Sequence, residues 1–124
     1  MKLLIVNGSP RAPRSNSRRY AELFQARWKG EARYAALTAK NHAELAAAAA
    51  EGAPYDYVAC CGPEPLMKIV AGMADAAGVF CEVSMERRMA CGVGACLSCV
   101  VDTVDGKRRA CVDGPVFPAS EVVW

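Results

Sequence analysis

Short apolar runs alternate with longer stretches of helical periodicity along residues 2–84. The runs at 2–6, 32–37, 55–61 and 79–84 are short and bounded by turn residues, so they predict four strands. Apolar residues recur at helical spacing within 17–28, 41–51 and 63–77, which predicts three helices. Strands that alternate with helices form parallel sheets. The pattern therefore predicts an α/β fold: a short parallel sheet with flanking helices, like half of a Rossmann or flavodoxin-like fold.

The third predicted helix has a recognisable start and end. Pro63 and Pro65 suit a helix start, and Gly78 suits a helix end. Between them, one apolar face is expected to be formed by Leu66, Ile69, Val70, Met73 and Ala77.

The alternation stops at Met85, where glycines, cysteines and turn residues take over. The chain is therefore expected to consist of two units. Residues 1–84 would form an α/β unit of the nucleotide-binding kind, and residues 85–124 a separate lobe, whose closely spaced cysteines predict that it binds a [2Fe–2S] cluster.

Closely spaced cysteines are the main chemical signal in the second unit. Within MACGVGACLSCVV, Cys91, Cys96 and Cys99 have the C-x₄-C-x₂-C spacing of plant-type [2Fe–2S] sites, and Cys111 follows. The two glycines of this loop let the backbone wrap around sulfur atoms and direct N–H groups at them. A zinc site is the alternative, although zinc is usually held by two short C-x₂₋₄-C pairs. Inert or disulfide-bonded thiols are a third alternative.

The segment after Cys99 is expected to fold back as a β-hairpin. The Asp-Gly pair at 105–106 is a strong turn signal and would place Cys111 opposite Val100. In that register Cys99 and Cys111 point to opposite faces. A bulge, or a strand that starts only after Cys99, is needed to bring both thiols to one cluster.

Composition restricts the class of protein. A chain of 124 residues can bury a core without disulfides, and its net charge of +2 gives no argument for nucleic acid. No apolar run is long enough to cross a membrane, and MKLLIVNGSP is too short for a signal peptide. We therefore expect a cytoplasmic protein with reduced thiols and no membrane partner, in which seven cysteines indicate metal or redox chemistry.

Three motifs carry a family resemblance. CGPEPLM, SMERRMACGVGACLSCVV and CVDGPVF follow one another between about residues 54 and 120, and together they resemble the C-terminal part of the iron–sulfur electron-transfer subunit of class 1B dihydroorotate dehydrogenase. The resemblance implies that Cys91, Cys96, Cys99 and Cys111 ligate a [2Fe–2S] cluster. In that family the cluster passes electrons between FAD in the same subunit and FMN in the catalytic subunit, within an NAD-linked oxidoreductase of pyrimidine biosynthesis. Related ferredoxin:NADP and sulfide oxidoreductase subunits are a nearby alternative.

The N-terminal segment departs from this family, whose subunit is longer and begins with a β-barrel that holds FAD. Residues 1–45 instead resemble the start of flavodoxin-like FMN reductases, through KLLIVNGSPRAPRSNSRRYAELF. That resemblance implies that Ser9, Ser15, Asn16 and Ser17 bind a flavin phosphate at a helix N-terminus. A polar loop that only caps a helix is the alternative.

The CGP turn is a further candidate site. Cys61 and Gly62 lie in it, and in the resembled reductases this turn faces the nicotinamide. Cys60 and Cys81 fall within predicted strands and are expected to be buried, without a metal.

Two classes of function remain. The chain is expected to be an electron-transfer subunit or domain and not a complete enzyme. Its expected partner is a flavoprotein catalytic subunit. The alternatives are a zinc-held interaction module and a flavodoxin-like FMN-binding reductase fragment.

Overall fold

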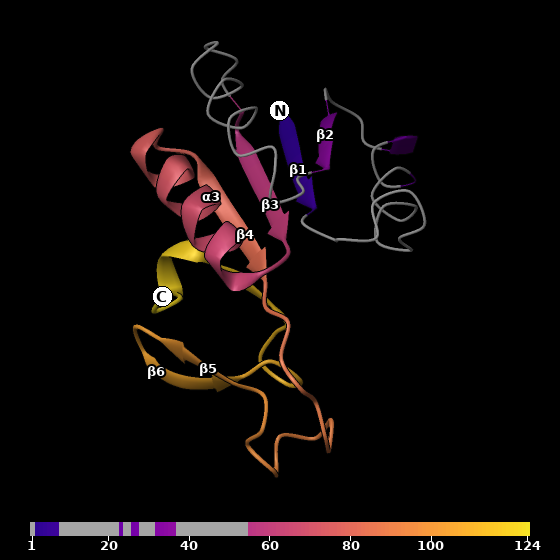
Figure 1. The fold of residues 1–124 in the computed structure, drawn as a ribbon, viewed down its shortest axis with the longest axis vertical. Coiled ribbons are helices and arrows are strands. Elements are labelled where there is room, and N and C mark those ends of the chain that lie inside the picture. The colour runs from indigo at the N-terminus through magenta and orange to yellow at the C-terminus, as the bar shows by residue number, and fades with distance from the viewer. Residues whose placement is uncertain (1, 8–22, 24–25, 28–31, 37–54) are drawn as a thin grey trace.

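The computed structural model describes residues 2–7, 23, 26–27, 32–36 and 55–124 (Figure 1). The four strands predicted from the sequence are present as β1 (Leu3–Asn7), β2 (Ala32–Ala36), β3 (Tyr57–Cys61) and β4 (Phe80–Ser84). The third predicted helix is present as α3 (Glu64–Ala76). The helices predicted at 17–28 and 41–51 lie largely outside the described residues, and residues 23, 26 and 27 are helical.

The main sheet has the strand order β2-β1-β3-β4-β7. Its first four strands are parallel, as the alternating pattern predicted. The fifth, β7 (Val116–Pro118), pairs antiparallel with β4, so the sheet is mixed and not purely parallel. The prediction missed β7 because three residues in a turn-rich segment carry no periodic signal.

Helix α3 begins and ends where the turn residues predict. Pro63 is its N-cap and Pro65 lies in the first turn, where a missing N–H is tolerated. At the other end Gly78 has φ +65°, and the N–H of Val79 bonds the carbonyl of Ala74 at 2.9 Å. This is a Schellman ending, which requires a residue with positive φ and so favours glycine.

The buried face of α3 differs from the predicted face. Ile69 is 46% exposed, so its assignment to the buried stripe is wrong. Ala77 is exposed as well, whereas Leu66 and Val70 are buried as predicted and Met73 is partly buried. The buried stripe is completed by Met67, Ala71 and Ala74. Apolar side chains thus extend beyond the stripe, and spacing alone does not tell which of them face the sheet.

The predicted β-hairpin is formed by β5 (Val100–Thr103) and β6 (Gly106–Arg109). Its register differs from the expected one, because Thr103 pairs with Gly106 and the turn is made by residues 104–105. Val100 therefore lies opposite Arg109 and not opposite Cys111.

One continuous core joins the sheet, α3 and the hairpin. It includes Val83 and Phe117 at the β4–β7 pair and Val101 in the hairpin, all at most 1% exposed. Gly114 lies against the Phe117 ring so closely that a Cβ there would lie 2.4 Å from a ring carbon. This packing explains the small residue in CVDGPVF. A 3₁₀ helix, Ala119–Glu121, follows, and Thr103 then bridges to Val122.

Candidate metal centre

Backbone N–H groups surround the Cys91 sulfur. The N–H of Cys96 donates to Cys91 Sγ at 3.5 Å, and the N–H groups of Val93 and Ala95 also contribute. These hydrogen bonds lower the pKa of Cys91, that of Cys96 having the largest effect. Donors directed at sulfur favour the thiolate, which is the form that ligates iron.

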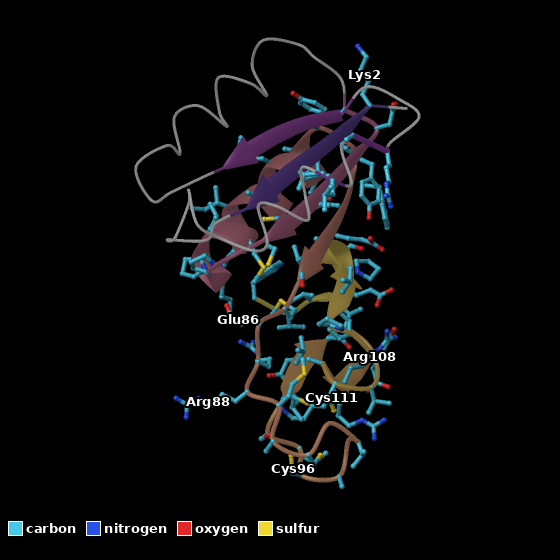
Figure 2. All side chains as sticks on the ribbon, turned by 90° about the vertical axis from the view of Figure 1, so that its right-hand side faces the viewer. Lys2, Glu86, Arg88, Cys96, Arg108 and Cys111 are labelled. Atoms are coloured by element: carbon cyan, nitrogen blue, oxygen red, sulfur yellow. The ribbon has the colours of Figure 1, made fainter. Side chains whose placement is uncertain are left out.

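The Cys96 thiol is even more strongly biased toward its anion. Ser98 Oγ lies 3.1 Å from Cys96 Sγ, and this contact is the largest cause of a Cys96 pKa lowered to about 6. Ser98 also donates to the carbonyl oxygen of Arg88 at 3.1 Å. Figure 2 shows Cys96 at the end of the lobe farthest from the main sheet.

Cys99 and Cys111 form a second pair. Cys99 is 1% exposed. Strand β5 begins directly after it, which is one of the two conditions under which Cys99 and Cys111 can reach the same cluster. On the other side β6 ends at Arg109, and the N–H groups of Val112 and Asp113 bond its carbonyl oxygen at 3.1 and 2.8 Å. This tight turn brings Cys111 to Cys99. A hydrogen bond between the two thiols is the main reason that the pKa of Cys111 is raised.

The cluster loop closes onto this turn at Gly94. Its φ is +79°, and its N–H donates to the Cys111 sulfur. A Cβ at Gly94 would lie 3.0 Å from both Arg109 Nη1 and Val112 Cγ2. The backbone conformation and the close packing therefore both call for glycine here.

The donor set consists of two neighbouring pairs, Cys91 with Cys96 and Cys99 with Cys111. Within the described residues, no three Cys, His, Asp or Glu side chains gather around a single point as one metal ion requires. Two pairs of thiols are a donor set that a cluster of two irons takes, since each iron binds two thiolates. That these four residues are the ligands stays a prediction.

The basic residues near the loop are mostly paired with carboxylates. Five basic residues lie close to the loop in sequence: Arg87, Arg88, Lys107, Arg108 and Arg109. Arg109 does lie near Cys99 and Cys111, but its side chain is hydrogen-bonded to Asp113 at 3.1 Å. Three others form the ion pairs Arg87–Glu64, Lys107–Asp102 and Arg108–Glu121. Arg88 points away from the lobe (Figure 2). Backbone N–H groups and Ser98 therefore provide the direct contacts to sulfur.

The remaining candidate residues lie at the carboxyl edge of the sheet. Cys61 is the exposed last residue of β3, in register with Asn7 and Ser84 on the neighbouring strands. Desolvation raises the pKa of Cys61, while a hydrogen bond with Ser84 opposes this effect. Gly62 follows with φ 159°, an extended conformation. The predicted phosphate-binding residues Ser9, Ser15, Asn16 and Ser17 lie outside the described part of the chain.

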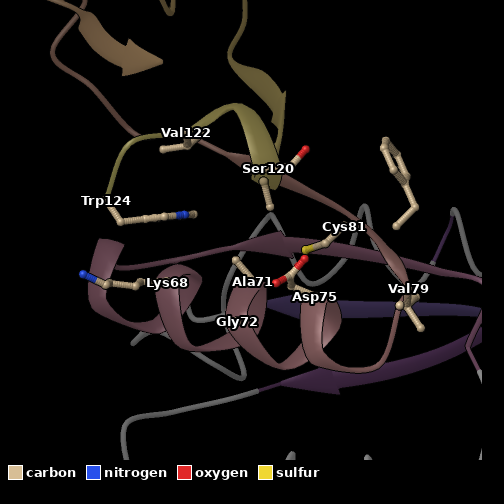
Figure 3. A pocket seen from close by; sticks show the side chains of 12 residues that line it. Lys68, Ala71, Gly72, Asp75, Val79, Cys81, Ser120, Val122 and Trp124 are labelled. Carbon is tan, nitrogen blue, oxygen red and sulfur yellow. The ribbon is translucent and has the colours of Figure 1, made fainter. Parts of the chain in front are cut away.

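Cys60 and Cys81 are buried, as predicted, at 3% and 6% exposure. Burial raises the pKa of Cys60 to about 12 and that of Cys81 to about 11, so neither supplies a thiolate readily. Cys81 lines a hollow of about 800 Å³ between α3 and the C-terminal segment, and Trp124 is another of its lining residues (Figure 3). None of the four paired cysteines lies in this hollow.

The site thus consists of a glycine-rich loop with two pairs of thiols, closed by a hairpin and anchored on an α/β sheet. Residues 86–123 match the family model of the iron–sulfur cluster binding domain of dihydroorotate dehydrogenase B. The resemblance inferred from the three motifs is thereby confirmed for this part of the chain.

Individual relatives agree with the family match. The chain is 54% identical over 69 residues to the electron transfer subunit of dihydroorotate dehydrogenase B (NAD(+)) of Clostridium acetobutylicum, and 56% identical over 68 residues to that of Clostridium perfringens. These matches cover 56% and 55% of this chain but 28% of each relative. The chain thus spans well under a third of the length of the curated relatives it matches.

A solved structure shares the fold. It is an NADH-dependent reduced ferredoxin–NADP oxidoreductase, which superposes on the whole chain with a TM-score of 0.72, at 22% sequence identity and over 55% of its own length. The α/β arrangement with a C-terminal β-hairpin is therefore one that reductases also use.

Sequence reasoning missed one group of the site, the Ser98 hydroxyl, whereas backbone N–H groups directed at sulfur by the glycine-containing loop were expected, and the Gly94 N–H is one of them. A signal for Ser98 was present, because a hydroxyl residue stands between the last two cysteines of the loop.

Proposed function

We propose that the chain transfers single electrons through a [2Fe–2S] cluster held by Cys91, Cys96, Cys99 and Cys111. The observation that carries this proposal is the arrangement of two thiol pairs within a set of N–H donors at an exposed end of the molecule. The bound cluster would supply one-electron redox chemistry. The chain's own contribution is to hold four thiolates and to direct hydrogen-bond donors at their sulfurs, which stabilises negative charge there.

The proposed context is that of the relatives, an electron-transfer subunit of dihydroorotate dehydrogenase in pyrimidine biosynthesis. The partner would then be a flavoprotein catalytic subunit that contains FMN, with NAD as the distant electron carrier. A flavin, FAD or FMN, would be held by that partner or by a further domain. The chain would act as one module of an NAD-linked oxidoreductase.

The loop around the cysteines offers a surface for such a partner. Val93 is 74% exposed and Leu97 is 61% exposed, and neither carries a charge that docking would have to desolvate. Leu97 also has φ 58°, which is costly for a branched side chain. A strained, exposed leucine beside two cysteines supports a role in contact with a partner.

Replacing Val93 or Leu97 by lysine should slow electron transfer to the partner and weaken the complex, while the absorption spectrum of the cluster survives. Each lysine places a charge in a contact that would exclude water, so we expect at least about tenfold slower transfer. Stopped-flow reduction with the candidate flavoprotein measures the rate.

Val104→Lys is the matched control, because Val104 is 65% exposed but lies in the hairpin turn. It should leave the rate unchanged. If the Val93→Lys and Leu97→Lys variants transferred electrons as fast as the wild-type protein and Val104→Lys, the docking surface would lie elsewhere.

For the N-terminal unit we propose a Rossmann or flavodoxin-like half over residues 1–84, with the cluster lobe over 85–124. The parallel strands β2-β1-β3-β4 support this proposal, since ligands of such sheets bind beyond the carboxyl ends of the strands. Cys61 and Gly62 lie at that edge, and a nicotinamide there would follow the resembled reductases. A flavin phosphate on Ser9, Ser15, Asn16 and Ser17, which lie outside the described residues, is the alternative proposal for this unit.

Among the helical segments that the structure describes, none has the length and apolar character needed to cross a membrane. We propose a cytoplasmic location, where thiols remain reduced and available to iron.

Metal and flavin analysis of the purified protein tests the proposed function. We expect iron and acid-labile sulfide in equal amounts, a reddish-brown colour and an EPR signal that appears on reduction. A colourless protein that contains zinc would instead support an interaction module, and yellow fluorescence without iron a flavin-binding fragment.

A further inference from the structure

Ser98 makes two hydrogen-bond contacts in the cluster loop. Its Oγ lies 3.1 Å from Cys96 Sγ and 3.1 Å from the carbonyl oxygen of Arg88. A hydroxyl carries a single hydrogen and can serve only one of two acceptors fully at a time. When Cys96 is protonated, both contacts can be satisfied, because its S–H can donate to Ser98 while the hydroxyl donates to the Arg88 carbonyl.

Ligation of iron by Cys96 changes which atoms can donate in these two contacts. A metal-bound Cys96 has lost its hydrogen, so its sulfur can only accept. The hydroxyl of Ser98 is then shared by a sulfur anion and a neutral carbonyl. Added negative charge on the sulfur strengthens the first bond, because hydrogen bonds to ionised acceptors are the stronger ones.

We propose that Ser98 is a positioning residue that sets the reduction potential of the cluster, by donating to Cys96 Sγ in the reduced state and to the Arg88 carbonyl in the oxidised state. This inference rests on the proposed function. Reduction brings one electron from a flavoprotein, and the proton of Ser98 stays on its oxygen throughout. The hydrogen bond that strengthens on reduction favours the reduced state and so raises the potential.

The surroundings allow the hydroxyl to move between its two acceptors. Arg88 and Ser98 are both exposed, so water can solvate the carbonyl that Ser98 leaves. Because Ser98 Oγ lies 3.1 Å from both acceptors, its hydrogen can turn from one to the other by rotation about the Cβ–Oγ bond, without a movement of the loop.

The reduction potential of purified protein with its cluster, measured by EPR-monitored redox titration, tests the proposal. Ser98→Ala should shift the one-electron equilibrium about tenfold toward the oxidised state, which corresponds to a potential more negative by about 59 mV. Ser98→Thr keeps a hydroxyl and should restore the potential. Ser120→Ala removes a serine hydroxyl from the 3₁₀ helix of the same lobe and should leave the potential unchanged.

Several outcomes would overturn the proposal. An unchanged potential in Ser98→Ala, or an equal shift in Ser98→Thr, would show that the hydroxyl does not act on the cluster. If Ser98→Ala takes up no cluster, Ser98→Gly is measured in its place. Failure of both variants to hold a cluster would assign Ser98 to assembly alone. Wild-type protein without a [2Fe–2S] signal would refute the proposed function itself, which is a different result from an unchanged potential.

Discussion

Serine in place of Cys99 or Cys111 is expected to abolish the visible absorption and the EPR signal of the protein, and serine at Cys91 or Cys96 to abolish or distort them. An alkoxide is a harder ligand than a thiolate and binds iron differently. Cys99 has the least freedom to be replaced by another ligand, because it is 1% exposed and fixed between the loop and β5. Iron content and the visible spectrum of each purified variant measure the effect.

Cys60→Ser and Cys81→Ser are the controls for this series. Both thiols are buried in the core beside α3, and burial keeps them protonated. A buried hydroxyl costs stability, so these variants should melt at a lower temperature with the spectrum unchanged. The ligand assignment would be wrong if Cys81→Ser bleached the protein while Cys111→Ser did not.

Gly94→Ala is expected to lose most of its cluster while the sheet remains folded. The backbone at φ +79° costs an alanine about 1–2 kcal/mol, which is about a tenfold change in an equilibrium constant. The new methyl group would also meet Arg109 and Val112 at 3.0 Å and push the loop away from Cys111. Iron per chain and circular dichroism, measured on the same sample, separate the two effects.

Gly92→Ala is a matched control, since Gly92 has a similar φ of +70° but no atom within 4 Å of the point where a methyl carbon would lie. It carries the same backbone cost without the collision. We expect a modest loss of stability and a retained cluster. If both variants lost the cluster equally, backbone strain would be the cause and the contact of Gly94 with Arg109 and Val112 would be irrelevant.

The sequence predicts well those features that depend on local signals. The parallel strands follow from short apolar runs, and the ends of α3 follow from Pro63 and Gly78. The spacing within the loop indicated that Cys91 and Cys96 lie close together, and the structure pairs them. The turn signal also predicted that Cys111 returns to Cys99, and it does. The hairpin register differs from the expected one, because Thr103 pairs with Gly106.

Features that depend on distant contacts were out of reach. The pairing of β7 with β4 is decided by the burial of Phe117 against the sheet, not by the pattern of three residues. Ile69 was assigned to the core because spacing says nothing about where the sheet ends beneath α3. The double contact of Ser98 depends on how the loop returns to residue 88, which no sequence period encodes.

Ser84 of β4 pairs with Val116 of β7 at the point where the chain leaves the sheet and rejoins it. Everything between these two positions, including all four paired cysteines, leaves the sheet at one strand and returns on its neighbour. The two attachment points are thus about 5 Å apart, the spacing of adjacent strands. The hairpin within this segment also bonds the chain beyond β7, since the N–H of Val104 donates to the carbonyl of Glu121 and that of Val123 to the carbonyl of Asp102. The cluster loop is therefore tied to the sheet twice, once through the β4–β7 pair and once through the hairpin.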